Sequence, residues 1–175
     1  MQSSGLNRAA LGAAAALLCA ASAFAATPRP VADMSIPVPS GRPINLKQYR
    51  GKVVLMVVMS MECDACIKSI DILNRLQKDF GPRGFQVVAA VGDQNAQYLL
   101  ADFGRRYRPA FPVGYLNQAQ IIQLGDLGKS AQHAYVPIFM FIDRKGTVRQ
   151  QVSGNEPFFT KEEASTRQAV QDLMK

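Results

Sequence analysis

One pair of cysteines stands at a spacing that suits redox chemistry. Cys63 and Cys66 are separated by two residues and closely follow the apolar run 53–59, which predicts a buried strand. Apolar side chains then recur at helical spacing over 65–80, so the pair is predicted to lie where that strand ends and a helix begins. The partial positive charge of a helix N-terminus favours the thiolate of Cys63, the species that attacks disulfides. Cys66, one helical turn later, is placed to attack the mixed disulfide and release a reduced substrate.

Two structural alternatives exist for the same cysteines. A zinc knuckle needs about four ligands, whereas the predicted mature chain retains only Cys63, Cys66 and the single His133 as soft donors. A purely structural disulfide is the weaker interpretation, because the loop between the two cysteines is so short that cross-linking it stabilises little. We therefore predict that Cys63 and Cys66 are the catalytic residues of a redox pair that uses no metal or other cofactor.

The first 25 residues are predicted to be a signal peptide. Arg8 precedes an uncharged, alanine-rich stretch that ends in Ala23-Phe24-Ala25, a small-x-small cleavage site. Cleavage after Ala25 would discard Cys19 and lower the formal net charge from +7 to +6, because Arg8 is the one charged side chain lost. An uncleaved membrane anchor fits less well, since a span needs about 20 strongly apolar residues. The sequence therefore predicts a periplasmic or otherwise exported protein, in a compartment where disulfides persist.

Composition predicts one domain behind an extended leader. With 175 residues, 48% of them hydrophobic, the chain can bury one sizeable core. Residues 26–45 carry five prolines and predict an extended leader that runs over the surface, which leaves 46–175 as the domain. Positive charges are spread along the chain apart from a cluster over 105–108, which we interpret as a solvated face. This distribution does not indicate nucleic-acid binding.

The elements beyond the cysteines alternate in type at first and then change. Buried strands are expected over 85–91 and 111–115 and helices over 96–107 and 119–124, an order that favours parallel pairing. Strands over 138–142 and 147–152 flank Asp143-Arg144-Lys145-Gly146, a turn signal that predicts an antiparallel hairpin.

A last helix is expected to run from Thr160, as its cap, to Met174, with Glu162 and Glu163 in its first turn. The expected fold class is therefore α/β, with a mixed central sheet flanked by helices.

These motifs together resemble the thioredoxin-like superfamily, and within it the exported TlpA/ResA-like thiol-disulfide oxidoreductases. The matching stretches are Gly51-Lys52-Val53-Val54-Leu55, Cys63-Asp64-Ala65-Cys66, Val136-Pro137 and Phe141-Ile142-Asp143-Arg144-Lys145-Gly146. The resemblance implies a thioredoxin-like fold with an inserted βα unit between the C-x-x-C helix and a cis-proline. It implies that this proline is Pro137, that it lies opposite the cysteines, and that the backbone of Val136 pairs with bound substrate. From position alone a trans proline would be the default.

Several residues differ from the pattern of that family. Glu62 stands where an aromatic residue is usual, and with Asp64 it places two carboxylates beside Cys63. Each opposes the helix dipole by roughly 0.3–1 kcal/mol. Glu62 and Asp64 are therefore predicted to tune Cys63 towards a less readily ionised thiol, and the pair towards a reductant. Val57 and Ser69 replace acidic residues of the family, which leaves the second cysteine without an identified proton acceptor.

The predicted function is that of a thiol:disulfide oxidoreductase that reduces disulfides of exported proteins. The resemblance implies a cysteine-containing exported client and an upstream thiol protein as electron donor, which could be membrane-bound. One alternative is a Sco-like copper chaperone that uses Cys63, Cys66 and His133, since thiolates and imidazole suit copper. Another is a peroxiredoxin-like peroxidase, although residues 60–62 lack the threonine and proline that prepare its reactive cysteine.

Overall fold

The computed structural model describes residues 28–127 and 135–175, which build helices around a six-stranded sheet. The strand order is β1-β8-β7-β4-β5-β6, and β2 pairs with β3 in a separate two-stranded sheet. The strands β1 to β8 are, in order, Arg29–Pro30, Ser35–Ile36, Ile44–Asn45, Val53–Met59, Phe85–Val91, Val113–Tyr115, Ile138–Ile142 and Thr147–Ser153. The helices are α1 (Asp64–Phe80), α2 (Ala96–Tyr107), α3 (Gln118–Gly125) and α4 (Glu162–Met174), and 3₁₀ turns span Leu46–Tyr49, Gly81–Arg83 and Pro157–Lys161.

Three apolar runs form the centre of the main sheet. β4 pairs in parallel with β5 and antiparallel with β7, so it lies between two strands that are themselves apolar. Every residue of β4 and β7 is buried, as expected for strands of a sheet that is covered on both faces. The predicted parallel unit, the antiparallel β7–β8 hairpin and the mixed central sheet are confirmed.

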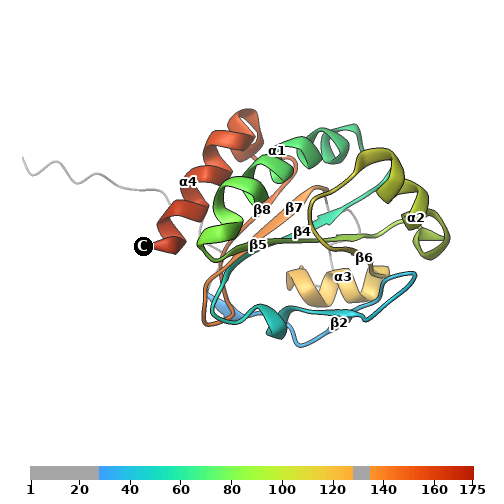
Figure 1. Cartoon of the computed structure of the whole chain (residues 1–175), viewed down its shortest axis with the longest axis horizontal. Coiled ribbons are helices and arrows are strands. Elements are labelled where there is room, and N and C mark those ends of the chain that lie inside the picture. The colour runs from blue at the N-terminus through green and yellow to red at the C-terminus, as the bar shows by residue number, and fades with distance from the viewer. Residues whose placement is uncertain (1–27, 128–134) are drawn as a thin grey trace, which may run out of the picture.

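The two faces of the sheet are covered by different segments (Figure 1). α1 and α4 lie against one face, whereas α3 and the segment that contains β2 lie against the other. One apolar cluster joins Leu73 of α1 to Val170 of α4, and a second joins Ile36 of β2 to Leu124 of α3. Successive β4 side chains alternate between these clusters, because neighbouring residues of a strand point to opposite faces.

The segment predicted as a leader is part of the folded structure. β1 pairs antiparallel with β8 at one edge of the main sheet. Near the other edge, the Pro37 carbonyl accepts the backbone N–H of Tyr115 in β6 at 3.0 Å. Met34, Ile36 and Ile44 are buried. The segment is extended, as predicted, but the expectation that it runs over the surface is wrong for these apolar residues.

The starts of β6 and α4 also differ from the prediction. β6 begins at Val113 and not at residue 111. α4 begins at Glu162 after Lys161, and no side chain caps it. Thr160 is therefore not the cap: it lies in the preceding 3₁₀ turn, where its hydroxyl donates to the Pro157 carbonyl at 2.7 Å. Within the described residues, none of the helices has the length and apolar character needed to cross a membrane.

Candidate active site

Cys63 lies at the junction between β4 and α1. Its backbone is extended, with φ −97° and ψ 109°, and it forms the N-cap of α1. Its Sγ accepts the backbone N–H of Cys66 at 3.2 Å, as the side-chain oxygen of serine or aspartate does at other helix N-termini. This hydrogen bond strengthens when the sulfur carries the negative charge that attack on a disulfide requires.

The two cysteines differ in accessibility. Cys63 is partly exposed, whereas Cys66 is fully buried beneath it. Burial raises the pKa of the Cys66 thiol, and the adjacent Cys63 thiol and the Asp93 carboxylate raise it further. Cys66 therefore remains a protonated thiol until a base takes its proton, and an incoming disulfide meets Cys63 first.

The peptide bond between Val136 and Pro137 is cis, as the family resemblance implied. The Cys63 thiol lies 3.8 Å from the Val136 carbonyl oxygen, to which it is oriented to donate. Val136 is half-buried and Pro137 is buried. The structure thus brings together the sulfur that was predicted to attack and the backbone that was predicted to pair with substrate.

Gly154, directly after β8, packs against this cis peptide. Its backbone N–H donates to the Tyr135 carbonyl at 2.9 Å. A Cβ atom at Gly154 would lie 2.4 Å from the Val136 carbonyl oxygen and 2.7 Å from its carbonyl carbon, distances that real Cβ atoms do not show. A residue without a side chain is therefore required for β8 to support the cis peptide from behind.

Asp93, just after β5, holds the loop that precedes Cys63. One carboxylate oxygen accepts from the Ser60 hydroxyl at 2.7 Å, and the other accepts from the Met61 backbone N–H at 2.8 Å. The Ser60 hydroxyl in turn accepts the Glu62 backbone N–H at 3.1 Å. The position of Cys63 thus depends on an aspartate that follows the neighbouring strand.

The two carboxylates predicted to tune Cys63 flank it in the structure. Glu62 and Asp64 are both exposed, and solvent and salt weaken the effect of an exposed charge. Beside Glu62 opens a cleft of about 450 Å³, which also borders Met61, Asp93, Gln94, Asn95 and Leu99. The cleft thus borders the residue that precedes Cys63, and the half-exposed Leu99 gives it an apolar surface.

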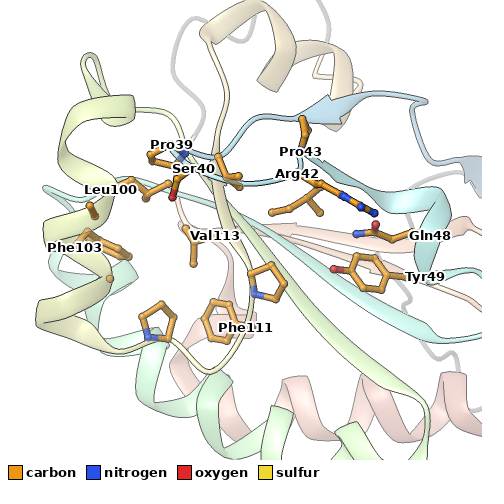
Figure 2. A pocket seen from close by; sticks show the side chains of 16 residues that line it. Pro39, Ser40, Arg42, Pro43, Gln48, Tyr49, Leu100, Phe103, Phe111 and Val113 are labelled. Atoms are coloured by element: carbon orange, nitrogen blue, oxygen red, sulfur yellow. The ribbon is translucent and has the colours of Figure 1, made fainter.

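A second hollow lies elsewhere, between the 38–49 segment and α2 (Figure 2). It encloses about 510 Å³, and Tyr49, Phe103 and Phe111 give it an aromatic wall with Arg42 at its rim. None of its lining residues belongs to 60–66, so it is separate from the cysteine pair.

The third ligand of the copper hypothesis, His133, lies outside the described residues. Within 28–127 and 135–175, no group of three or more histidine, cysteine, aspartate or glutamate side chains could hold a metal ion. Because one of its three ligands lies outside these ranges, the copper hypothesis stays a prediction.

Sequence reasoning identified the sulfurs and the cis-proline but missed the residues that support them. Asp93 follows β5 and Gly154 follows β8, and neither belongs to a motif near the cysteines. The signal that could have found Asp93 is its place at the end of a parallel strand, where neighbouring strands of a sheet bring their carboxyl ends together.

The sequence profile of the AhpC/TSA family matches residues 28–151. The thiol-disulfide oxidoreductase ResA of Bacillus thuringiensis is 27% identical over 116 residues, which cover 66% of this chain and 63% of ResA. Glutathione peroxidase 7 of Bos taurus is 34% identical over 108 residues, which cover 58% of each chain. The chain therefore spans less than two thirds of the length of these relatives.

A solved structure covers more of the chain than these sequence matches do. A thiol:disulfide interchange protein of the thioredoxin family from Chlorobium tepidum superposes with a TM-score of 0.70 at 19% identity. The superposition covers 86% of this chain and 99% of that protein. This likeness establishes a thioredoxin-like fold, as the motifs around the cysteines predicted.

Proposed function

The chain belongs to the AhpC/TSA family, and on that premise we propose that it is a thiol:disulfide oxidoreductase of the TlpA/ResA type. The observation that carries the proposal is the position of Cys63. This partly exposed sulfur caps α1, faces the Val136 carbonyl and has the buried Cys66 behind it. An attacking thiol with a protected resolving thiol is the arrangement that two-step disulfide exchange needs.

The reaction proceeds in two exchanges. The Cys63 thiolate attacks one sulfur of a client disulfide, which forms a Cys63–client bond and expels the other client sulfur as a thiolate. Cys66 then loses its proton and attacks Cys63, which forms the Cys63–Cys66 bond and expels the second client thiolate. The client gains two electrons and the cysteine pair loses two, so a donor thiol protein must reduce the pair again.

We assign the direction of electron flow from the charges beside Cys63. Glu62 and Asp64 disfavour a further negative charge on its sulfur, which favours the oxidised pair and makes the reduced pair a stronger electron donor. The clients are then oxidised cysteine pairs of exported proteins, if the first 25 residues direct export as their sequence predicts. Equilibration of the pair with glutathione buffers measures the potential on which this direction depends.

The mechanism predicts opposite fates for the two cysteine variants. Cys66→Ser keeps the attacking thiol but has no resolving thiol, so it should accumulate a mixed disulfide with insulin and lose turnover. Cys63→Ser should form no mixed disulfide, because the remaining sulfur is buried. Mass spectrometry of the intact adduct, with insulin reduction measured in parallel, checks both. Turnover that survives in Cys66→Ser would refute the two-thiol mechanism.

A peroxidase is the second candidate, and the 34% identity to glutathione peroxidase 7 favours it. In that reaction Cys63 would attack a peroxide oxygen, form a sulfenic acid and release water or an alcohol, and Cys66 would then displace water to form the disulfide. The two functions separate in one assay with a common thiol reductant. Peroxide consumption that depends on Cys63, without insulin reduction, would favour the peroxidase.

A further inference from the structure

One carboxylate oxygen at the start of α4 is shielded from solvent and has no role in the two exchanges described above. Glu162 is the first residue of α4, and its Oε1 is inaccessible to solvent without a hydrogen-bond partner among the described residues. Glu162 as a whole is partly exposed, whereas Ser69 of α1 and Thr166 of α4 are fully buried. An unsatisfied carboxylate oxygen costs stability, so its retention needs an explanation.

The Ser69 hydroxyl lies close enough to this carboxyl group to lower its pKa by hydrogen bonding. It donates to the Ala65 carbonyl at 3.0 Å, and a hydroxyl has one hydrogen to donate. Because this hydrogen is donated to the Ala65 carbonyl, the Glu162 Oε1 atom receives no hydrogen bond from Ser69. A rotation of the Ser69 hydroxyl would turn the same hydrogen towards Glu162.

Other charges near this site point away from it. Glu163, the next residue of α4, pairs with Arg75 of α1 at 2.7 Å and with Arg167 at 3.4 Å, and Arg167 also reaches Asp79 of α1 at 2.9 Å. The β4 residues beneath the helices are apolar. Burial raises the pKa of Glu162, contact with Ser69 lowers it and the charge of Glu163 raises it, with a net upward shift.

Cys66 supplies the proton that this carboxylate can take. Cys66 and Ser69 are three residues apart on α1 and both are fully buried, so they are neighbours on the same face of the helix. Burial, the Cys63 thiol and the Asp93 charge disfavour ionisation of the Cys66 thiol, and together they outweigh a backbone hydrogen bond from Ser60 that favours it. Resolution of the mixed disulfide therefore needs a base, and the carboxyl group that contacts Ser69 is that of Glu162.

We propose that Glu162 receives the Cys66 proton through the Ser69 hydroxyl when the mixed disulfide is resolved. This inference rests on the proposed two-thiol function and adds a base to its second step. The Cys66 proton passes to the Ser69 oxygen while the Ser69 proton passes to Glu162. The Cys66 sulfur then forms its bond to Cys63 as the Cys63–client bond breaks, and the client sulfur leaves as a thiolate.

The Glu162→Gln variant distinguishes a base from a nearby negative charge, because the two roles predict opposite changes in the rate of resolution. If Glu162 acts only through its negative charge, then Glu162→Gln makes Cys66 easier to ionise and speeds resolution. If Glu162 takes the proton, the same variant slows resolution although the thiol becomes more acidic. Glu163→Gln is the matched control, because the adjacent Glu163 pairs with arginines outside the buried cluster.

A chromogenic aromatic disulfide reports the two exchanges separately. The attack of Cys63 releases the first coloured thiolate, and the attack of Cys66 on the resulting adduct releases the second. In Glu162→Gln we expect the first release to be unchanged and the second to slow by at least about tenfold near neutral pH. Ser69→Ala should show the same selective loss, and Glu163→Gln should keep a second release close to the wild-type rate near neutral pH. The rates should converge at alkaline pH, where Cys66 ionises without a base.

An unchanged or faster second release in Glu162→Gln would overturn the inference. Failure of the proposed function looks different, because the wild type would then give no second release, or Cys66→Ser would retain it. The pH profile gives an independent readout: the wild-type second release should rise with an apparent pKa above the ordinary carboxyl value of about 4.3, and Ser69→Ala should lose this step. A wild-type profile without it would also overturn the inference.

The variant is expected to fold. Because the folded-state pKa of Glu162 is raised, its contribution to stability is lost as pH rises through that pKa, so the ionised carboxylate is unfavourable at neutral pH. Glu162→Gln removes this charge and should unfold at an equal or higher temperature. A lower unfolding temperature at neutral pH would assign Glu162 a structural role instead and overturn the inference.

Discussion

At the residue scale, the two sulfurs are made unequal by their surroundings. Cys63 receives a backbone N–H at the start of α1, whereas Cys66 is buried among apolar side chains that disfavour its thiolate. Asp93 affects both sulfurs, because it holds the loop before Cys63 and its charge raises the pKa of Cys66. One carboxylate is therefore expected to help the first exchange and to oppose the second.

Because of this double role, Asp93→Asn should change the rates of the two exchanges in opposite directions. The variant keeps one acceptor oxygen but loses the other, so the Met61 or Ser60 contact is broken and the loop before Cys63 loosens. The first release from the aromatic disulfide should slow several-fold, whereas the second should become faster because a negative charge near Cys66 is gone. Stopped-flow absorbance measures both.

Asp102→Asn is the control for that experiment. Asp102 is exposed on α2 and pairs with Arg105, away from the cysteine loop, and its loss should change neither phase. A first phase that is equally fast in Asp93→Asn and the wild type would show that the loop keeps its position without the carboxylate.

Site residues that belong to a short sequence motif could be predicted, whereas those that tertiary packing brings to the site could not. Cys63 and Cys66 stand three residues apart at a recognisable strand-to-helix junction. Glu162 contacts Ser69 of α1 only because α4 packs beside α1, which no local pattern encodes. The sequence predicted Glu162 as an acidic residue in the first turn of a helix, where it interacts favourably with the helix dipole. It did not predict that the carboxylate is shielded from solvent.

At the element scale, the cis peptide at the start of β7 is supported by the end of β8. Gly154 fills the space behind Val136 with backbone alone, and no gap remains for a methyl group. The resemblance predicted a cis bond at Pro137, but not the glycine that makes room for it. The need for glycine at this position arises from the close approach of two backbone segments, and it produces no periodic pattern in the sequence.

Gly154→Ala should therefore displace the peptide that faces Cys63. The added Cβ meets the Val136 carbonyl group, which is backbone and cannot rotate away. We expect a loss of about 1–3 kcal/mol in the free energy of unfolding, as for other overpacked sites, together with slower reduction of insulin. Urea denaturation and the insulin assay measure the two effects.

Gly104→Ala offers a matched control for this substitution. Gly104 lies inside α2, and a Cβ atom added there would meet open space, so alanine should stabilise the helix by up to about 1 kcal/mol. If Gly154→Ala were as stable and as active as Gly104→Ala, the close packing behind the cis peptide would be of no consequence.

Local patterns set most element boundaries correctly. β5 and α2 have the predicted bounds, and α1 begins one residue before the predicted apolar periodicity. The misplaced cap of α4 has a physical cause, since the 3₁₀ turn over Pro157–Lys161 uses the Thr160 hydroxyl for its own carbonyl. Serine and threonine hydroxyls serve turns and helix caps equally well, so sequence could not decide between them.

At the scale of the whole molecule, the N-terminal segment bonds to strands at both edges of the main sheet. β1 covers the outer side of β8, and Pro37 bonds to β6 at the opposite edge, so residues 29–45 contact both ends of the strand order. Its prolines made the segment look like a surface linker. The apolar residues Met34, Ile36 and Ile44 indicated burial less strongly than the prolines indicated a linker. Tertiary packing nevertheless buries all three.

Ile36→Ala tests whether this segment belongs to the cooperative unit. The Ile36 side chain is completely buried in the second apolar cluster, and its truncation should cost about 2–5 kcal/mol of unfolding free energy. Ser35→Ala, at the exposed neighbouring position, should be close to neutral. Urea denaturation with a single transition would show both values, and equal stabilities of the two variants would mean that the segment is only loosely attached.

The pairing of β1 with β8 also has a consequence for the order in which the chain can assemble. Arg29 stands opposite Val148, so the strand that emerges first during synthesis must wait for one that emerges almost last. β4, at the centre, likewise waits for β7. Contacts between residues so distant in sequence make folding slow. The chain therefore spends its synthesis, and any transfer across a membrane, with its sheet incomplete and both thiols still accessible to oxidation.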